Sequence, residues 1–185
     1  NYYLAPMVNC LEAMLPPLPK KLPETSDQRP VTRDQTLILV PSINRIPETL
    51  AKFKNAKNFT TYHNQLKDSQ RFLMWQKIKK GEFDYVFGSR SAIFAPMPNL
   101  KKIVIFDEHD GVYKDERSPY YDTLTVAGKI SALTGAKLEI VDTAPKITTY
   151  FNFPKQVVVS LPKSQIKPFI VDMKKEREEG NFSPV

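Results

Sequence analysis

The sequence predicts an α/β protein with a mostly parallel sheet and helices on both of its faces. Short apolar runs recur along the chain, and segments with helical periodicity separate them. These runs lack the apolar–polar alternation of a strand with one face in water, and alternating strands and helices of this kind are typical of parallel sheets. The 185 residues, of which 41% are hydrophobic, suffice for one domain with its own core.

The first 34 residues are expected to lie outside that domain. Residues 2–15 form an apolar segment with the pattern of a short helix, which Pro16 would end. Residues 16–34 contain five prolines among many charged side chains. Because each proline fixes its own φ and disfavours helix before it, this segment is expected to be an extended linker.

From residue 35 the expected elements follow in regular order. Strands are predicted where short apolar runs occur, at residues 36–41, 59–63, 84–88, 101–108, 137–142 and 156–161. Helices are predicted between them at residues 47–55, 65–80 and 119–134. Pro47 is allowed in a first helical turn, and Gly81 and Gly135 are typical helix stops. Residues 162–185 are polar and charged and are expected to be a tail.

Composition limits the function classes. The excess of 27 Lys and Arg over 20 Asp and Glu gives a net charge of +7, which suggests an acidic partner such as nucleic acid; a solvated lysine-rich surface explains it equally well. A single cysteine, Cys10, excludes an intrachain disulfide and a cysteine-based zinc cage. No apolar run is long enough to span a membrane and no basic leader precedes one, so a cytoplasmic protein is expected.

One candidate site follows the apolar strand of IVIFDEHD (103–110). In parallel sheets, ligands lie beyond the carboxyl ends of the strands, and this strand ends in Asp107 and Glu108. In nucleotide hydrolases the first such acid holds Mg²⁺ and the second polarises the attacking water. An acidic strand end exposed to solvent explains the same residues. The phosphate-binding loop G-x-x-x-x-G-K-[ST] does not occur anywhere in the chain, whose first glycine is Gly81.

A second candidate site consists of hydroxyl and guanidinium groups after two other strands. GSRSAIFAP (88–96) offers Ser89, Arg90 and Ser91, and LVPSINRIPE (39–48) offers Ser42 and Arg45. Such groups suit the phosphate oxygens of a nucleic-acid strand. A surface turn with an exposed arginine is the alternative interpretation.

These segments together resemble the PriA family of bacterial primosomal replication-restart helicases. The resemblance runs from Thr36 to Asp122 and is most specific in RSAIFAPMPNL and DEHDGVYK. It implies a three-layer, RecA-like first helicase lobe at residues 35–161. It also implies a remnant of the N-terminal DNA-binding region at residues 1–15 and a tail at 162–185 that leads to a second lobe.

The resemblance also implies residue roles. Asp107, Glu108 and His109 would be a degenerate DExH box, one acid shorter than the D-E-E-H of the family, with Asp107 as the Mg²⁺ ligand. Ser42, Arg45, Ser89, Arg90 and Ser91 would contact DNA. Asp142 and Thr143 stand where the family has its S-A-T-P turn, which couples ATP to DNA. ATP with Mg²⁺ is therefore implied as a cofactor, and forked DNA and primosome proteins as partners, without a membrane.

The chain departs from the family pattern as well. A proline-rich linker stands where the phosphate-binding loop is expected, and the second lobe with its zinc-binding cysteines does not follow, so no zinc is expected in this chain. We therefore expect a DNA-binding lobe that does not hydrolyse ATP alone. Two alternatives remain open: an excerpt of a complete ATP-dependent 3'–5' DNA helicase, and a non-catalytic primosome scaffold.

Overall fold

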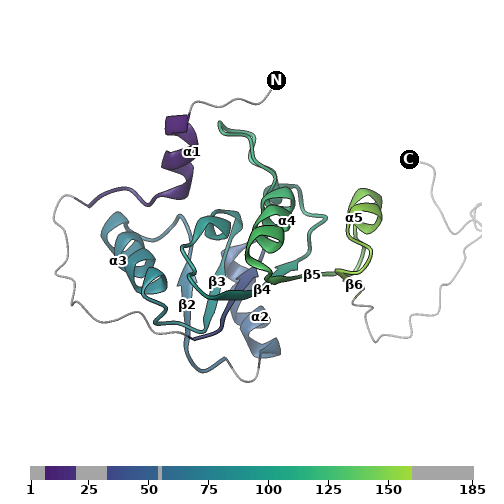
Figure 1. The fold of residues 1–185 in the computed structure, drawn as a ribbon, viewed down its shortest axis with the longest axis horizontal. Coiled ribbons are helices and arrows are strands. Elements are labelled where there is room, and N and C mark those ends of the chain that lie inside the picture. The colour runs from purple at the N-terminus through teal and green to yellow at the C-terminus, as the bar shows by residue number, and fades with distance from the viewer. Residues whose placement is uncertain (1–6, 20–32, 54–55, 160–185) are drawn as a thin grey trace, which may run out of the picture.

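A computed structural model describes residues 7–19, 33–53 and 56–159 of the chain (Figure 1). The predicted tail, the centre of the predicted linker and residues 2–6 of the predicted first helix lie outside these residues. The described part of that helix is α1 (Met7–Met14). None of the helices among the described residues is long and apolar enough to cross a membrane.

The sheet has six strands, all parallel, as predicted. They are β1 (Gln35–Leu39), β2 (Phe59–Tyr62), β3 (Tyr85–Gly88), β4 (Leu100–Phe106), β5 (Lys137–Asp142) and β6 (Val157–Val159). Their order across the sheet is β2-β3-β1-β4-β5-β6, and every neighbouring pair is parallel. The central strand β1 therefore ends between β3 and β4, which brings the loops after these three strands together.

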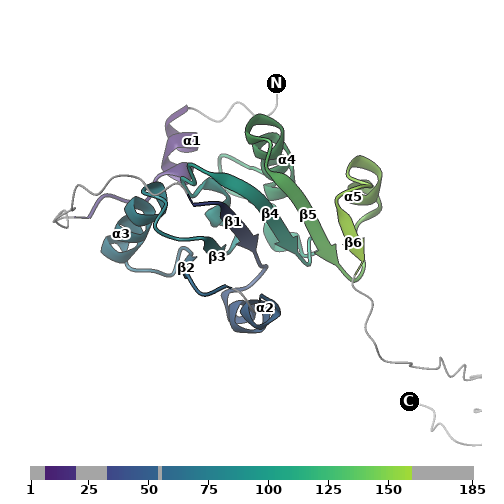
Figure 2. The same ribbon diagram turned by 60° about the horizontal axis from the view of Figure 1, so that its bottom comes forward.

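Helices cover both faces of the sheet, which confirms the predicted three layers (Figure 2). They are α2 (Ile46–Lys52) on one face, and α3 (Asp68–Lys79) and α4 (Thr123–Thr134) on the other. A fifth helix, α5 (Ile147–Asn152), precedes β6 and was not predicted. Three short 3-10 helices, η1 (Ile43–Arg45), η2 (Arg90–Phe94) and η3 (Gly111–Tyr113), lie in the loops at the carboxyl edge.

Side chains of β1 and of Val40, which directly follows it, alternate between two apolar clusters. Leu37 and Leu39 belong to the cluster beneath α3, α4 and η2, whereas Ile38 and Val40 belong to the cluster beneath α2. All four are at most 1% exposed, so the central strand is buried on both faces. Burying each such side chain contributes about 1.5–3 kcal/mol, which explains why continuous apolar runs identified these strands.

The amino-terminal edge of the sheet is closed by a buried amide. Gln35, fully buried at the start of β1, donates from Nε2 to the Phe83 carbonyl at 3.2 Å. Its Oε1 accepts from the Asn99 amide, also at 3.2 Å. A buried polar side chain is tolerated where both of its hydrogen-bonding functions are satisfied in this way.

Some boundaries differ from the sequence expectation. The strand predicted at 101–108 ends at Phe106, because Asp107 turns the chain with a left-handed φ of 50°. The helix predicted at 119–134 begins at Thr123, because the Asp122 carboxylate accepts from the amide of Thr125 and caps the helix. The helix predicted at 65–80 likewise begins later, at Asp68.

Candidate nucleic-acid interface

The candidate site lies at the carboxyl edge of the sheet. Leu39 of β1 pairs with Gly88 of β3 on one side and with Ile105 of β4 on the other. The loops that start after these strands are therefore neighbours. A close approach fixes the first of them, because a side chain on Gly88 would collide with Ala92 and with the carbonyl of Tyr62.

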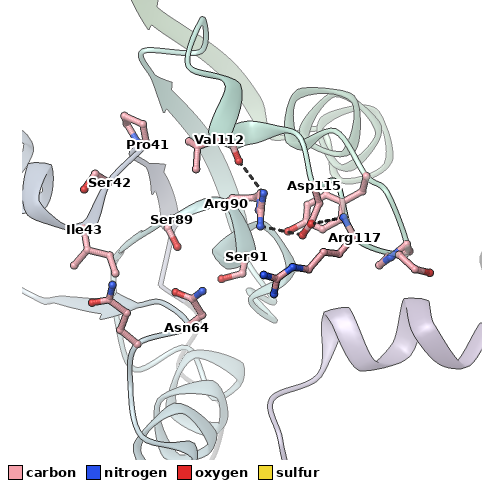
Figure 3. Close-up of a pocket in the computed structure, with 14 residues that line it drawn as sticks. Pro41, Ser42, Ile43, Asn64, Ser89, Arg90, Ser91, Val112, Asp115 and Arg117 are labelled. Carbon is pink, nitrogen blue, oxygen red and sulfur yellow. Dashed lines mark hydrogen bonds and ion pairs between the residues drawn. The ribbon is translucent and has the colours of Figure 1, made fainter.

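A pocket of about 440 Å³ opens between these loops (Figure 3). It collects four of the predicted DNA-binding residues, Ser42, Ser89, Arg90 and Ser91, from two different loops. Its other polar side chains are Asn64, Gln65, Asp115, Arg117, Ser118 and Tyr121. The Oγ of Ser91 is buried and has no hydrogen-bond partner among the described residues.

Arg90 lines the pocket, but its guanidinium is engaged within the protein. Nη1 donates to the carbonyls of Val112 at 3.0 Å and Lys114 at 2.8 Å. Nη2 pairs with the carboxylate of Asp115 at 3.0 Å, and both side chains are mostly buried. Arg90 thus fastens the loop that follows η3 to the end of β3.

Arg45, the fifth predicted DNA-binding residue, lies outside the residues that line this pocket. Its Nη2 pairs with Asp107 Oδ2 at 3.2 Å, and its Nε is 3.9 Å from a carboxylate oxygen of Glu48. One ion pair therefore joins a predicted DNA-binding residue to the predicted Mg²⁺ ligand. The Arg45 side chain is still 46% exposed, so solvent reaches it.

Glu108 points into the protein and is only 3% exposed. Its Oε1 accepts the backbone N–H of Lys146 at 2.7 Å, and Lys146 Nζ donates to the carbonyl of Glu108 at 3.0 Å. The Nζ also lies 3.8 Å from the second carboxylate oxygen. This buried carboxylate therefore has a hydrogen-bond donor and a nearby positive charge, as burial of a charge requires.

His109 and Asp142 form the third pair. His109 Nδ1 lies 2.8 and 2.9 Å from the two carboxylate oxygens of Asp142, and the His109 amide donates to the same carboxylate at 3.0 Å. The hydrogen bond with Asp142 raises the pKa of His109 above its usual value. Burial alone would raise the pKa of Asp142, but hydrogen bonds from Ala144 and His109 lower it below its usual value.

These pairs join the two predicted motifs. Asp142, from the predicted coupling turn, bonds His109 of the degenerate DExH box, and Lys146 from the same loop bonds Glu108. Thr143 is exposed beside them. The loops after β4 and β5 are thus held together by hydrogen bonds that the Glu108 and Asp142 carboxylates accept and by the bond from Lys146 Nζ to the Glu108 carbonyl.

Asp107, the predicted Mg²⁺ ligand, is not part of a larger cluster of acidic side chains among the described residues. Among the residues that the structure describes, no three His, Cys, Asp or Glu side chains gather where they can hold a metal. The carboxylate of Asp107 faces the Arg45 cation, and that of Glu108 is buried against Lys146. In nucleotide sites Mg²⁺ takes one or two carboxylates and completes its shell with phosphate oxygens and waters, so Asp107 stays a predicted ligand for which Arg45 competes.

Several residues of this edge were not predicted. Lys146 follows the predicted coupling turn, and Asn64, Gln65, Asp115 and Arg117 line the pocket. Asn64 and Gln65 follow β2, so the rule that ligands meet strand ends could have found them. Asp115 and Arg117 lie in an irregular loop of 16 residues between β4 and α4, where no periodicity signals which side chain turns inward.

Most of this chain is similar in sequence to known proteins. No family model matches the chain. Three curated relatives, each named Replication restart protein PriA, are 29% identical over 160 residues in Thermotoga maritima, 31% over 161 in Synechocystis and 32% over 158 in Bacillus subtilis. Each match covers 80% of this chain. The chain is PriA-like.

The PriA-like chain spans about a fifth of the length of these relatives, from 19% in Synechocystis to 21% in Thermotoga maritima. Two solved structures are distantly similar. The yeast Dbp5 C-terminal domain bound to Gle1 and IP6 has a TM-score of 0.37 and 11% identity, over 60% of this chain and 75% of that one. Mss116p DEAD-box helicase domain 2, bound to an RNA duplex, has a TM-score of 0.34 and 12% identity, over 70% and 59%.

Proposed function

We propose that this PriA-like chain is a DNA-binding lobe that holds the backbone of forked DNA without sequence preference. The observation that supports it best is the pocket at the carboxyl edge, which gathers hydroxyls and side-chain amides from the loops after β1, β2 and β3. Such groups donate to phosphate oxygens and position a nucleic-acid strand, whereas sequence is read at base edges. The net charge of +7 favours the same partner.

The direct test is binding of the chain to fluorescein-labelled forked DNA, measured by fluorescence anisotropy. Two forks of the same shape and unrelated sequence are expected to bind equally. Affinity is expected to fall steeply between about 50 and 200 mM salt, because phosphate contacts release counterions. An affinity that is flat over this range, or binding to one sequence alone, would refute the proposal.

The chain alone is proposed not to hydrolyse ATP. Phosphoryl transfer depends on charges placed around the phosphates and their metal ion. The two acids that would serve this chemistry are paired with Arg45 and Lys146. A DNA-stimulated ATPase assay should give no turnover above about 0.1 per second, well inside the range of ordinary enzymes. A faster rate would refute this proposal.

A second candidate function is a share in an ATP-dependent DNA helicase. It is favoured by the length of the PriA relatives, of which this chain matches about a fifth. A G-K-[ST] loop in a longer gene that encodes this chain would support it. Interaction with primosome proteins belongs to the same proposal; capture of replication proteins by a chain that has no affinity for DNA would favour a scaffold instead.

A further inference from the structure

Arg117 lies on the same edge as the two predicted arginines, Arg45 and Arg90, but unlike them it has a guanidinium without an ion pair. Arg45 pairs with Asp107, and Arg90 pairs with Asp115. Arg117 lines the pocket and is exposed, and its guanidinium makes no ion pair or hydrogen bond with any residue of the described ranges. Figure 3 shows its side chain reaching toward Ser91, whose own hydroxyl lacks a partner.

The backbone of Arg117 is held even though its side chain is free. Its amide donates to Asp115 Oδ1 at 3.0 Å, while the other carboxylate oxygen of Asp115 pairs with Arg90. Its carbonyl accepts the amide of Tyr120. Arg90 also bonds the carbonyls of Val112 and Lys114, so three contacts of one guanidinium fix the loop from which Arg117 projects.

We infer that Arg117 supplies the cation that binds a DNA phosphate in this pocket, and that Arg90 is a positioning residue that holds its loop. The inference rests on the proposed function, and it reverses the role expected for Arg90 from the sequence. A guanidinium that already donates hydrogen bonds to two carbonyls and a carboxylate has few N–H donors left for a phosphate. A free one beside unpaired hydroxyls has its full set of donors.

Lysine substitutions separate the two roles. Lysine keeps the charge but lacks the planar fork that reaches several acceptors at once. Arg117→Lys should therefore keep the affinity for forked DNA within about threefold, because a phosphate accepts a point charge. Arg90→Lys should weaken the binding of forked DNA nearly as much as Arg117→Ala does. One ammonium group cannot hold Val112, Lys114 and Asp115 together.

The salt dependence identifies the residue that meets the phosphate. Arg117→Ala should weaken binding by about three- to tenfold and reduce the slope of log K against log salt by about one. In the double variant, Arg90→Ala should add little to the loss caused by Arg117→Ala, since residues that act through one contact are not additive. Hydrogen exchange in residues 111–117 should quicken in Arg90→Ala and not in Arg117→Ala.

The experiment uses the 185-residue chain and anisotropy with labelled forked DNA. Arg33→Ala is the matched control: it removes an arginine charge at the opposite edge of the sheet, where Arg33 is half-exposed and pairs with Asp84 at 3.6 Å. It should shift affinity by less than about twofold, since salt screens an exposed charge that lies at the edge of the sheet opposite the pocket. Thermal unfolding of each variant confirms folding.

The outcomes are distinct. If the wild-type chain does not bind forked DNA, the proposed function fails and the inference fails with it. If the wild type binds and Arg117→Ala binds equally well at every salt concentration, the inference alone is wrong. It is also wrong if Arg90→Lys keeps its affinity while Arg117→Lys loses it. Should Arg90→Lys not fold, the affinities and salt slopes of Arg117→Ala and Arg117→Lys decide the question.

Discussion

Arg45 and Asp107 connect the loop after β1 to the loop after β4 through a contact of 3.2 Å between Nη2 and Oδ2. The two residues are 62 positions apart in sequence and were assigned to different sites, one for DNA and one for Mg²⁺. Each therefore limits what the other can bind. A phosphate must compete with Asp107 for Arg45, and a cation must compete with Arg45 for Asp107.

Removing the Asp107 charge should therefore strengthen DNA binding. Asp107→Asn frees the Arg45 guanidinium and removes a charge that repels phosphate, so the affinity for forked DNA should rise by about two- to fivefold at low salt. Asp84→Asn is the control, because it removes the partner of Arg33 at the opposite edge. Anisotropy titrations of both variants decide the matter, and weaker binding by Asp107→Asn would speak against a phosphate near Arg45.

The His109–Asp142 pair should make the folded state less stable as the pH rises through neutrality. Because the pKa of His109 is raised on folding, its stabilisation is complete below the unfolded value near 6.5 and is lost as pH rises through the folded pKa. Melting temperatures between about pH 5.5 and 8.5 should fall with pH in the wild type and fall less in His109→Gln. Equal slopes in the two proteins would contradict this assignment.

Truncating Asp142 should be costly. Its carboxylate is 1% exposed and accepts from the amides of His109 and Ala144 as well as from the imidazole. Asp142→Ala leaves these donors unpaired and should lower the free energy of unfolding by about 2–3 kcal/mol. Asp110→Ala removes an exposed cap of η3 and should cost less than about 1 kcal/mol. Urea unfolding compares them, and equal losses would refute the ranking.

Gly88 should tolerate no side chain. Gly88→Ala places a methyl group against Ala92 and the backbone of Tyr62, neither of which can withdraw, so the free energy of unfolding should fall by about 1–3 kcal/mol. Gly111→Ala is a suitable control, because its added methyl group meets nothing within 4 Å. Chemical denaturation of the two variants tests the contrast, and an unchanged Gly88→Ala would show that β3 and η2 can separate.

The sheet was predictable because its strands are runs of buried apolar residues. The expected range 137–142 coincides with β5, and the others agree within a few residues. The helix α5 was missed because it has six residues and turns Ile147 and Phe151 toward solvent, so it lacks the buried stripe that marks a helix in sequence. The predicted end of β4 was too late, because the sequence does not show that the backbone of Asp107 adopts a left-handed φ and turns the chain.

The site was predictable only in part. The strand-end rule found Ser42, Ser89 and Ser91, which line one pocket. It could not tell a free arginine from a paired one. The partners of Arg90 lie 22 to 25 positions away in an irregular loop, and that of Arg45 lies in another loop altogether. Pairing of this kind depends on three-dimensional proximity, which residue types at strand ends do not specify.

The buried amide of Gln35 has a practical consequence for experiments. Its hydrogen bonds to Phe83 and Asn99 lie at the amino-terminal edge of the sheet, opposite the pocket. The neighbouring Lys101 is exposed at the start of β4 on that edge. A dye or surface tether attached at position 101, through a Lys101→Cys substitution in a chain whose Cys10 is replaced, would leave the opposite rim open to an incoming strand.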